Sequence, residues 1–530
     1  MKYQNFRVAL LALCCAGLVG GCTLRPVVDS LEPMPAATEL LPDPIVTSGY
    51  DDTAPEAAPE SDTDLWHRVR AGFGLDLDID NARIRAQRDW YSRHQSYLDR
   101  ISQRGERYLH HIVEQAEARD MPLELVLLPV VESAFDPFAY SHGRAAGPWQ
   151  FIPSTGKHFG LEQDWWADQR RDIVASTEAA LTYLQQLANR FDGDWLLALA
   201  SYNAGGGNVS RAITRNRNAG KPTDFWSLEL PGETMAYVPK LLALAQIVKA
   251  PEDYGLALPP IADEPYFASV ETGGQIDLAQ AAALAEISLE ELYLLNPAFN
   301  RWATAPDGPH RLLVPASHAE RFSEGLRNLP AEQRMRWDRY TIRSGDSLIG
   351  IARRFDTTPA VLRDVNRLRG NTIVAGRTLL IPRPAQDAGN YTLSADARLD
   401  ARQNRAVSGR RQVTHTVASG DTFWQLARHY RVGVRELAAW NQMAPGDTLR
   451  VGQQLAVWTE NAGGSTTAAS RPEMVRRVSY SVRRGDSLYA IANRFNVSVN
   501  QINTWNRING QRYLQPGQQL TLYVDIRDAP

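Results

Sequence analysis

The chain has 530 residues, of which 44% are hydrophobic and 22% charged, and its formal net charge at pH 7 is −3. This length exceeds what one hydrophobic core normally supports and so indicates several domains, while the composition is that of folded globular proteins. The small net charge excludes a broad basic surface of the kind that nucleic-acid-binding proteins use, so we expect no nucleic-acid partner.

The first 21 residues are typical of a secretory signal peptide. Lys2 and Arg7 form a basic start, and an apolar run from Val8 to Val19 follows them. A run of this length is too short for a confident transmembrane helix, but it suits the apolar core of a signal sequence.

The apolar run ends in Val19-Gly20-Gly21-Cys22, which resembles the bacterial lipobox, whose cysteine is acylated after cleavage. All three cysteines of the chain lie in this region, at positions 14, 15 and 22, so lipidation of Cys22 would leave the mature chain without a disulfide. Thr23 is not the aspartate that marks inner-membrane retention. The resemblance therefore implies an outer-membrane lipoprotein facing the periplasm of a Gram-negative bacterium. The alternative is an ordinary signal peptide or anchor with incidental cysteines.

The next two segments differ sharply in composition. Residues 22–65 are rich in Pro, Ala, Asp and Glu, and we expect a disordered tether there. From Trp66 onward apolar residues recur at three- and four-residue spacing, for example in 173–191 and 194–205. Residues 66–258 are therefore predicted to form a mostly α-helical domain without convincing strands.

The C-terminal half contains three repeats, which begin YTIRSGDSLIGIARRF, HTVASGDTFWQLARHY and YSVRRGDSLYAIANRF. Each combines a short strand pattern, a Gly-Asp pair and an amphipathic helix, and a second apolar stretch closes each unit. An asparagine follows the aspartate at one constant distance; the pairs are Asp346 and Asn366, Asp421 and Asn441, and Asp486 and Asn506. The pattern predicts βααβ modules over 338–384, 412–458 and 477–525.

These repeats resemble the LysM module, which binds N-acetylglucosamine-containing glycans such as peptidoglycan and chitin. In that family the glycan meets the loop after the first strand and the loop between the second helix and the second strand. The resemblance implies glycan-binding loops at Gly345-Asp346, Gly420-Asp421 and Gly485-Asp486, and after Asn366, Asn441 and Asn506. The aspartates also have an ordinary interpretation, because Asp is a preferred N-cap of a helix.

A fourth, degenerate copy is predicted over 262–335. Leu278 and Asn296 fall in the register of the complete repeats, but Gln275-Ile276 stands in place of Gly-Asp. We interpret this copy as a module that packs against the helical domain and has lost glycan binding; the alternative is an unrelated helical hairpin. Flexible linkers are expected over 385–411 and 459–476, which would allow the modules to bind separate sites on the same cell wall.

Glu132 ends the apolar run LELVLLPVV and begins the sequence ESAFDP. We predict a buried helix that starts at Asp120 as N-cap, kinks at Pro129 and stops at Asp136-Pro137. Glu132 then lies in the last helical turn, where burial raises the pKa of a carboxyl and suits a general acid. Asp136 is the nearest candidate for a second carboxylate, although a turn role suits it better.

Three further segments combine small and polar residues: AAGPWQFIPSTG at 145–156, SYNAG at 201–205 and ETMAYVP at 233–239. With Glu132-Ser133 they resemble the lysozyme-like domain of the soluble lytic transglycosylase superfamily, whose motifs run E-S, G-L-M-Q, A-Y-N and E-x-x-x-Y. The second and third motifs depart from that pattern, since they read GPWQ and SYN. The fold class implied is α+β and multidomain: a mostly α lysozyme-like catalytic domain followed by small βααβ LysM modules.

The resemblance implies one acid with two tasks. Glu132 would protonate the glycosidic oxygen between N-acetylmuramic acid and N-acetylglucosamine, and its carboxylate would then take the proton of the muramic C6 hydroxyl, which closes a 1,6-anhydro ring. The other motif residues would bind substrate or have structural roles: Ser133 and Gln150 bonding the glycan or Glu132, Tyr202 donating to Glu132 or lining the sugar site, Asn203 holding its loop, and Glu233 and Tyr237 positioning the sugar and its N-acetyl group.

Other features carry weaker signals. His142 and His158 lack metal-ligand spacing and are expected as loop residues, so neither a metal nor a cofactor is predicted. Trp165-Trp166 could stack on sugars or pack in a core. Two rival functions remain, a lysozyme-type hydrolase on the same scaffold and a non-catalytic peptidoglycan-binding lipoprotein. In each case the partners are glycan strands and the outer membrane, and we expect a monomer.

Overall fold

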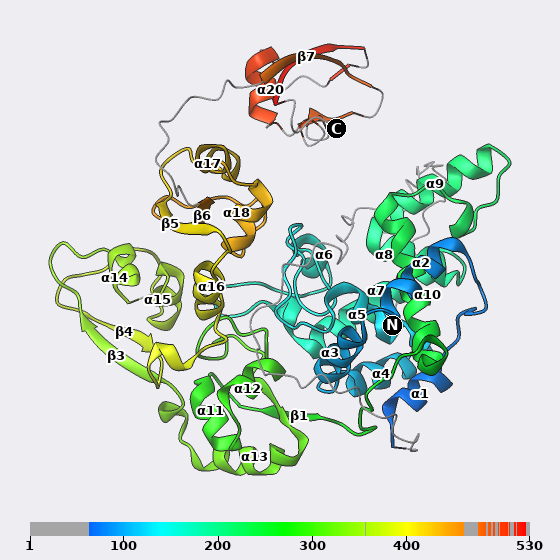
Figure 1. Ribbon diagram of the computed structural model, residues 1–530. Helices are drawn as coiled ribbons and strands as arrows, with labels where there is room; N and C mark the ends of the chain where they lie inside the picture. The colour runs from blue at the N-terminus through cyan, green and yellow to red at the C-terminus, as the bar shows by residue number, and fades with distance from the viewer. Residues whose placement is uncertain are drawn as a thin grey trace, which may run out of the picture. The chain divides into compact units, whose positions relative to one another are not determined.

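A computed structural model describes residues 63–355, 357–460 and, with several short gaps, 475–525. The predicted signal peptide, Cys22 and most of the tether lie outside these residues. The chain forms two compact units, residues 1–398 and 399–530 (Figure 1). No helix in the described part is both long and apolar enough to span a bilayer.

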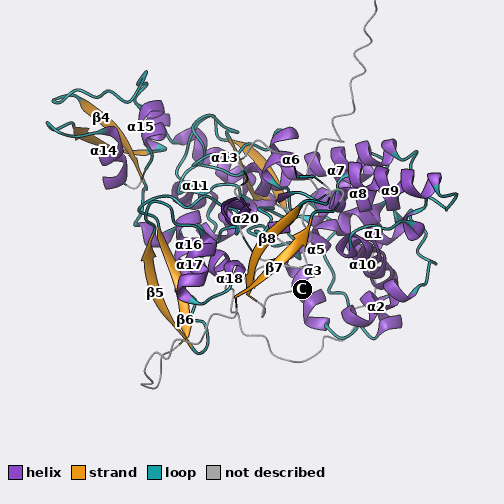
Figure 2. Cartoon of the chain, turned by 90° about the horizontal axis from the view of Figure 1, so that it is seen from above, coloured by secondary structure: helices purple, strands orange, loops and turns teal. Residues whose placement is uncertain are grey.

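The N-terminal part of the first unit is helical. Among the residues described, no strand precedes Phe267, so the predicted mostly α-helical domain is confirmed (Figure 2). Its elements are α1 (Leu65–Ala71), α2 (Ala82–Tyr91), α3 (Gln95–Gly105), α4 (Leu109–Glu117), η3 (Leu123–Leu127), α5 (Leu128–Ser133), α6 (Pro153–His158), η4 (Gln169–Arg171), α7 (Ile173–Arg190), α8 (Trp195–Ala204), α9 (Gly206–Asn218), η5 (Phe225–Ser227), α10 (Gly232–Lys249) and η6 (Pro251–Tyr254).

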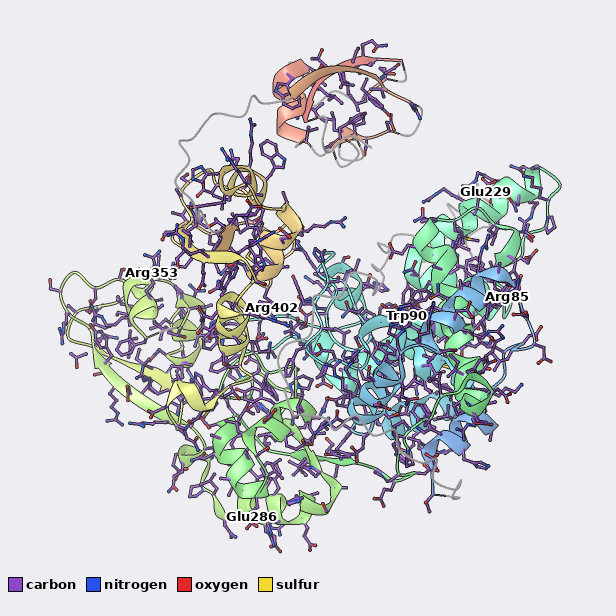
Figure 3. The ribbon with its side chains drawn as sticks, in the orientation of Figure 1. Arg85, Trp90, Glu229, Glu286, Arg353 and Arg402 are labelled. Carbon is purple, nitrogen blue, oxygen red and sulfur yellow. The ribbon has the colours of Figure 1, made fainter. Side chains whose placement is uncertain are left out.

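The centre of this domain is built from α8 and α10, which are buried along most of their length. Asp194 caps α8 by accepting a hydrogen bond from the Leu197 amide, so the helix begins directly after the polar turn that precedes it. Helix α10 packs against α2, α5 and α8. Charged side chains such as Arg85 are exposed at the surface (Figure 3).

The predicted helix from Asp120 is wrong in its first half. Asp120 has a positive φ of 51°, and a short 3₁₀ segment, η3, runs from Leu123 to Leu127 before α5 begins at Leu128. Pro129 explains the break, because proline has no N–H to donate and is tolerated only in a helix's first turn. Glu132 lies in the last turn of α5 as predicted, and Ala134, in the left-handed region, ends the helix.

Four antiparallel strand pairs follow in the part of the chain that the structure describes, and helical segments connect the two strands of each pair. Where they are described, the modules confirm the predicted βααβ order, including that of the degenerate fourth copy. The strand pairs are β1 (Phe267–Glu271) with β2 (Arg311–Pro315), β3 (Arg336–Thr341) with β4 (Thr378–Arg383), β5 (Arg410–Thr416) with β6 (Gln454–Glu460), and β7 (Val475–Ser481) with β8 (Gln519–Asp525). The enclosed helices are α11 (Leu278–Ala285), α12 (Leu289–Leu295), α14 (Leu348–Arg354), α15 (Pro359–Val365), α17 (Phe423–Tyr430), α18 (Val434–Trp440) and α20 (Val499–Asn506).

The constant asparagine of the repeats is a structural clamp. In the second LysM module, Asn441 Nδ2 donates to the carbonyls of Leu437 and Ala456, each at 2.8 Å, and Oδ1 accepts from the Ala456 amide at 2.7 Å. The amide therefore ties the end of the second helix to the closing strand. Asn296, Asn366 and Asn506 make the same three bonds in their own modules.

In the first two LysM modules the aspartates after the first strand are not helix N-caps, which corrects one of the two interpretations. Ser347 and Thr422, one residue later, fill that position. Asp346 Oδ2 instead accepts from the Arg343 amide at 2.8 Å and from the Tyr340 hydroxyl at 2.7 Å, which fixes the loop itself.

The same loop geometry recurs in the other two modules. Asp421 accepts from the Ala418 amide and pairs with His415 Nε2 at 2.9 Å, whereas Asp486 bonds Tyr480 and the Arg483 amide. Gly345 and Gly420 have φ values of 87° and 93°, which suits glycine in these turns, and Gly485 lies outside the described residues.

The degenerate module packs against the helical domain, as predicted. Arg107 pairs with Glu291 at 2.7 Å, and Arg311 pairs with Asp172 at 2.8 Å. An additional helix, α13 (Ala319–Asn328), lies between the short 3₁₀ turns η7 (Ala316–His318) and η8 (Ala331–Gln333). The surface of the degenerate module carries exposed charged side chains such as Glu286 (Figure 3).

The flexible linker predicted over 385–411 is wrong for most of its length. This segment contains η9 (Ala388–Asn390) and α16 (Ala395–Asn404). Tyr391 is buried, and its hydroxyl lies 3.0 Å from both carboxylate oxygens of Asp277. The Arg398 guanidinium lies over the Phe138 ring, 4.2 Å from its centroid. The amino-acid composition of a segment does not predict aromatic and cation–π contacts of this kind. The linker predicted over 459–476 falls largely outside the described residues.

The clamp generates a stability prediction. Replacing Asn441 by Ala removes three buried hydrogen bonds, each worth about 1 kcal/mol, so the second LysM module should lose roughly 2–3 kcal/mol. Hydrogen exchange of the full chain, read by mass spectrometry, should then speed up across 454–460 by on the order of 10- to 100-fold. Strand β4 of the first module serves as internal control. Unchanged protection of 454–460 would contradict the clamp.

Candidate active site

The Glu132 carboxyl is held between helices and shielded from solvent. Its side chain is 0% exposed. The Tyr237 hydroxyl, from α10, donates a hydrogen bond to Glu132 Oε1 at 2.5 Å. Glu132 Oε2 has no hydrogen-bond partner among the described residues. One oxygen is therefore fixed in place, while the other is free to interact with a substrate atom.

Burial dominates the electrostatics of this carboxyl. It raises the pKa of Glu132 from 4.5 to about 8, although the hydrogen bond from Tyr237 and the charge of Lys240 lower the pKa and Glu233 raises it further. At neutral pH most molecules therefore hold a proton on Glu132. A carboxylic acid in this state can donate its proton to a substrate.

Glu124 shows the contrasting case of a buried structural carboxyl in the same apolar run. Its oxygens accept hydrogen bonds from the Gly74 amide at 3.0 Å and the Leu75 amide at 2.8 Å. Burial raises the pKa of Glu124, and these two amides lower it. Glu124 was not considered in the sequence analysis. Its hydrogen-bond partners are backbone amides 50 and 49 residues away, which a local pattern cannot show.

One of the two roles considered for Tyr202, donation to Glu132, belongs to Tyr237, while the other, lining the sugar site, stays a prediction. Tyr202 donates its hydroxyl to the Trp149 carbonyl at 2.9 Å, so it does not donate to Glu132. Tyr237 makes that contact instead. Burial raises the pKa of both phenols well above the ordinary value, so each keeps its proton and remains a donor.

Ser133 and Gln150 do not contact Glu132 directly. The Ser133 hydroxyl lies 2.9 Å from the Pro129 carbonyl and 3.0 Å from the Pro148 carbonyl, and so joins α5 to the neighbouring loop. Gln150 Nε2 donates to the Gly147 carbonyl at 2.9 Å, whereas Gln150 Oε1 has no partner in the described part of the chain. Both side chains are fully buried.

Gly147 is required by a close backbone approach. Its φ is 80°, and a Cβ at this position would lie 2.1 Å from the Arg170 carbonyl oxygen. Any other residue would push this loop away from the segment behind it. The glycine of the GPWQ motif therefore acts through backbone packing and not through a side chain.

Asn203 and Glu233 lie at the junction of α8 and α10. Asn203 Oδ1 accepts from the Thr234 hydroxyl at 2.7 Å, so it joins two helices and does not hold a loop. Within the described residues, Asn203 Nδ2 and the neighbouring Ser201 hydroxyl are buried without partners. Glu233 is exposed in the first turn of α10. Ser201 was not singled out in the sequence analysis, because a serine inside an apolar helix is common.

Asp136 occupies a turn, in agreement with the preferred prediction. Its Oδ1 accepts a hydrogen bond from the Phe138 amide at 2.8 Å, two residues further along. Asp and Asn commonly close turns in this way. The structure therefore gives Asp136 a local role and leaves Glu132 as the acid in the apolar setting.

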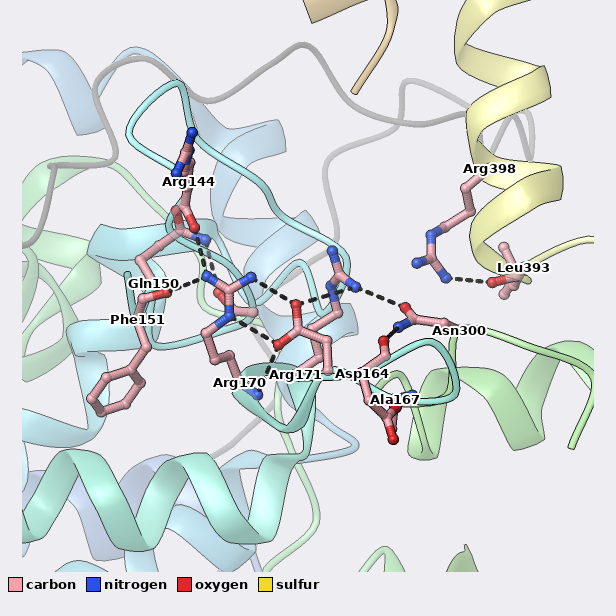
Figure 4. Close-up of polar contacts among 12 residues, drawn as sticks. Arg144, Gln150, Phe151, Asp164, Ala167, Arg170, Arg171, Asn300, Leu393 and Arg398 are labelled. Atoms are coloured by element: carbon pink, nitrogen blue, oxygen red, sulfur yellow. Dashed lines mark hydrogen bonds and ion pairs between the residues drawn. The ribbon is translucent and has the colours of Figure 1, made fainter. Parts of the chain in front are cut away.

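A buried ion pair supports the loop that carries Gln150. Arg170 binds Asp168 through two bonds, at 2.9 and 2.7 Å, and also donates to the carbonyls of Arg144 and Phe151 (Figure 4). Burial raises the pKa of Asp168, but Arg171 and Arg170 together outweigh this effect and hold the pKa below its ordinary value. The DQRR segment looks like a solvated surface in the sequence, so this network was not predicted.

The remaining candidates have ordinary positions. His142 is half-buried and His158 exposed, and no cluster of three or more possible metal ligands occurs among the described residues. Trp166 is 4% exposed and packs with Trp302, so the core-packing interpretation holds for it. The Arg301 guanidinium lies over Trp165 at 4.4 Å from the ring centroid.

Comparison with known proteins identifies the domains. Residues 111–225 match the transglycosylase SLT domain, residues 266–331 match the LysM-like domain of lytic transglycosylase MltD, and residues 340–382, 415–458 and 480–522 match the LysM domain. These matches confirm the resemblances drawn from the motifs and the repeats.

Two curated proteins and one solved structure are among those to which this chain is similar. Membrane-bound lytic murein transglycosylase D of Escherichia coli K12 is 39% identical over 407 residues, which cover 73% of this chain and 85% of that protein. An autolysin of Enterococcus faecalis is 34% identical over 176 residues, covering 32% of this chain and 23% of that protein. The solved lytic transglycosylase Slt of Pseudomonas aeruginosa is 27% identical, covers 29% of this chain and 25% of its own, and has a TM-score of 0.22.

Burial of Glu132 predicts a pH-dependent cost in stability. Because the pKa of Glu132 rises from 4.5 to about 8 on folding, the folded chain binds more protons than the unfolded chain between these values. The free energy of unfolding contributed by this group therefore falls as pH rises through that window. Glu132→Gln removes the effect, so the variant should be more stable than the wild type at pH 7, by on the order of 3 kcal/mol.

Calorimetric unfolding of both full chains at pH 4.5 and pH 7 checks this prediction. The gain in Tm should be present at pH 7 and largely lost at pH 4.5. An equal difference at both pH values, or a variant less stable at pH 7, would contradict the assigned protonation state.

Proposed function

The chain belongs to the family of membrane-bound lytic murein transglycosylase D, whose members are lytic transglycosylases of peptidoglycan, and we propose that Glu132 is its single acid–base catalyst. The observation that supports this role is a fully buried carboxyl with a raised pKa and one unpaired oxygen. The lytic activity cleaves the bond between N-acetylmuramic acid and N-acetylglucosamine and leaves 1,6-anhydro ends.

In the first step, the proton on Glu132 passes to the glycosidic oxygen. The bond between this oxygen and the anomeric carbon of the muramic residue breaks, and the N-acetylglucosamine side leaves as an alcohol. The positive charge that develops at the anomeric carbon is met by the N-acetyl group of the same sugar. Tyr237 holds Oε1 by its 2.5 Å bond, so Oε2 is the oxygen that delivers the proton.

In the second step, the Glu132 carboxylate takes the proton of the muramic C6 hydroxyl. The C6 oxygen attacks the anomeric carbon, and the anhydro ring closes while Glu132 returns to its acid form. Because the nucleophile belongs to the substrate, its effective concentration is high and no second carboxylate is needed. The position of Asp136 in a turn agrees with a mechanism that uses one carboxylate.

Unpaired polar groups near the catalytic motifs provide the substrate contacts. We assign to the sugar hydroxyls and the N-acetyl group the buried atoms that lack partners within the described chain, which are Gln150 Oε1, Asn203 Nδ2 and Ser201 Oγ. A buried polar atom without a partner costs about 1–3 kcal/mol, and a bound glycan would supply the missing bonds. Ser133 and Tyr202 shape the site by fixing the backbone around Pro148 and Trp149.

The three LysM modules would hold the enzyme on the glycan through their two loops. Ile349 and Val374 on the first module and Val451 on the second are exposed apolar side chains on or beside those loops, which suits the apolar faces of sugars. In the degenerate module the corresponding loop is used for packing: Gln275 Nε2 donates to the Thr304 carbonyl, and Ile276 is 0% exposed. This supports a loss of glycan binding in that copy.

The lipobox supports a location at the outer membrane. We assign acylation to Cys22, so that residues 22–62 would link the lipid to the first helix while the enzyme works in the periplasm as a monomer. Release of the full-length protein from the membrane fraction tests this assignment. Cys22→Ser should move the protein to the soluble periplasmic fraction and leave lytic transglycosylase activity on isolated walls unchanged; a variant still retained by membranes would contradict lipidation.

The products separate the proposed mechanism from hydrolysis. Purified walls digested with the full chain should release muropeptides that end in 1,6-anhydro-muramic acid, each lighter by one water than the hydrolytic product. Mass spectrometry should find these products with the wild type, and Glu132→Gln should reduce their release by more than about 100-fold while still binding walls. Reducing muramic ends would show hydrolysis, and full activity of the variant would remove Glu132 from the mechanism.

A further inference from the structure

Helix α10 presents a polar stripe toward the catalytic carboxyl. Glu233, Tyr237 and Lys240 are spaced by four and three residues, which places them along one helical face. The bond between Tyr237 and Glu132 shows where this face points. On either side of that bond, Lys240 and Glu233 act electrostatically on Glu132 with opposite sign. The face therefore carries a negative group, a hydroxyl and a positive group in sequence.

Lys240 is unusual in two respects. Its side chain is partly buried, yet it forms no hydrogen bond or ion pair with the residues that the structure describes. Burial lowers the pKa of Lys240, and the charge of Glu132 opposes this effect. Lysine is also rare in this chain, which has 5 lysines among 57 basic residues. A compact ammonium is thus placed here in a protein that mostly uses arginine, whose planar fork occupies more space.

We propose that Lys240 is a positioning residue for the reaction: its ammonium stabilises the Glu132 carboxylate that forms after the glycosidic oxygen has been protonated. This inference rests on the proposed role of Glu132. Lys240 does not exchange a proton in either step. It supplies the positive charge that a fully buried carboxylate requires during the interval between giving up one proton and taking the next.

The chemistry of the two steps explains why this charge is needed. The resting site holds a neutral carboxylic acid, so it contains no buried carboxylate charge before the first step. Once the proton has moved to the leaving oxygen, a negative charge appears in a site that is 0% exposed. Tyr237 donates one hydrogen bond to this charge, and Lys240 adds the opposite charge. Glu233 opposes the effect from an exposed position, where water screens it.

Paired variants of the full chain test the inference through the pH profile of anhydro-muropeptide release. Lys240→Met should lower the rate by about 10-fold and move the alkaline limb of kcat/KM upward by roughly 1 pH unit, because the acid form of Glu132 persists longer. Glu233→Gln should move the same limb downward. Lys240→Arg should restore the position of the limb, since it restores the charge.

Lys249→Met is the matched control, because Lys249 is an exposed lysine in the last turn of the same helix and should leave the profile unchanged. A loss of rate in Lys240→Met with the alkaline limb in its wild-type place, in a chain with wild-type Tm, would overturn the inference. Glu132→Gln separates the proposed role of Glu132 from that of Lys240. If this variant still forms anhydro products, the role of Glu132 is refuted. If it is inactive and the pH profile of Lys240→Met is unmoved, only the role of Lys240 is refuted.

Discussion

The protein depends on keeping one carboxyl group out of water. Glu132 is fully buried, and the phenol of Tyr237 bonds only one of its oxygens. Burial without a charged partner in contact is unfavourable for a carboxylate, so the group holds a proton at neutral pH and becomes an acid that can act on a glycosidic oxygen. Stability is lost in exchange for reactivity, as is common at catalytic sites. The rest of the domain is arranged so that this cost can be tolerated.

Several local features fix the geometry around that carboxyl. Pro129 limits α5 to one short segment, and left-handed Ala134 ends it directly after Ser133. Gly147 allows the neighbouring loop to approach the backbone of Arg170, and the buried pair of Arg170 with Asp168 supports that loop from behind. Each feature acts through the backbone or through residues outside the substrate contacts. Together they leave Glu132 little freedom to move.

The division into a helical enzyme domain and LysM modules could be predicted from the sequence, because it follows from the periodicity of apolar residues and from the constant spacing within the repeats. The asparagine spacing predicted the modules, and the structure shows its cause in the three hydrogen bonds of Asn441. The burial of Glu132 was also predictable, since its neighbours in the run are apolar. These predictions needed only local information.

Several wrong predictions depended on side-chain contacts that the sequence pattern does not show. Tyr202 and Tyr237 both belong to motifs, and only the packing of α8 against α10 decides which hydroxyl reaches Glu132. Asp346 caps nothing, because it turns back toward Tyr340 in the preceding strand. The segment after residue 385 has the composition of a linker, yet the Tyr391 hydroxyl bonds Asp277, which lies 114 residues earlier in the chain.

The protonation state of Glu132 is the most direct test of this account. An infrared titration would follow the protonated carboxyl band that the wild-type chain shows and the Glu132→Gln variant lacks. The account predicts that this band persists at pH 7 and disappears with a pKa of about 8. A band that disappears near the ordinary glutamate pKa of 4.5 would show that the group is ionised at neutral pH, and Glu132 could not then serve as the acid.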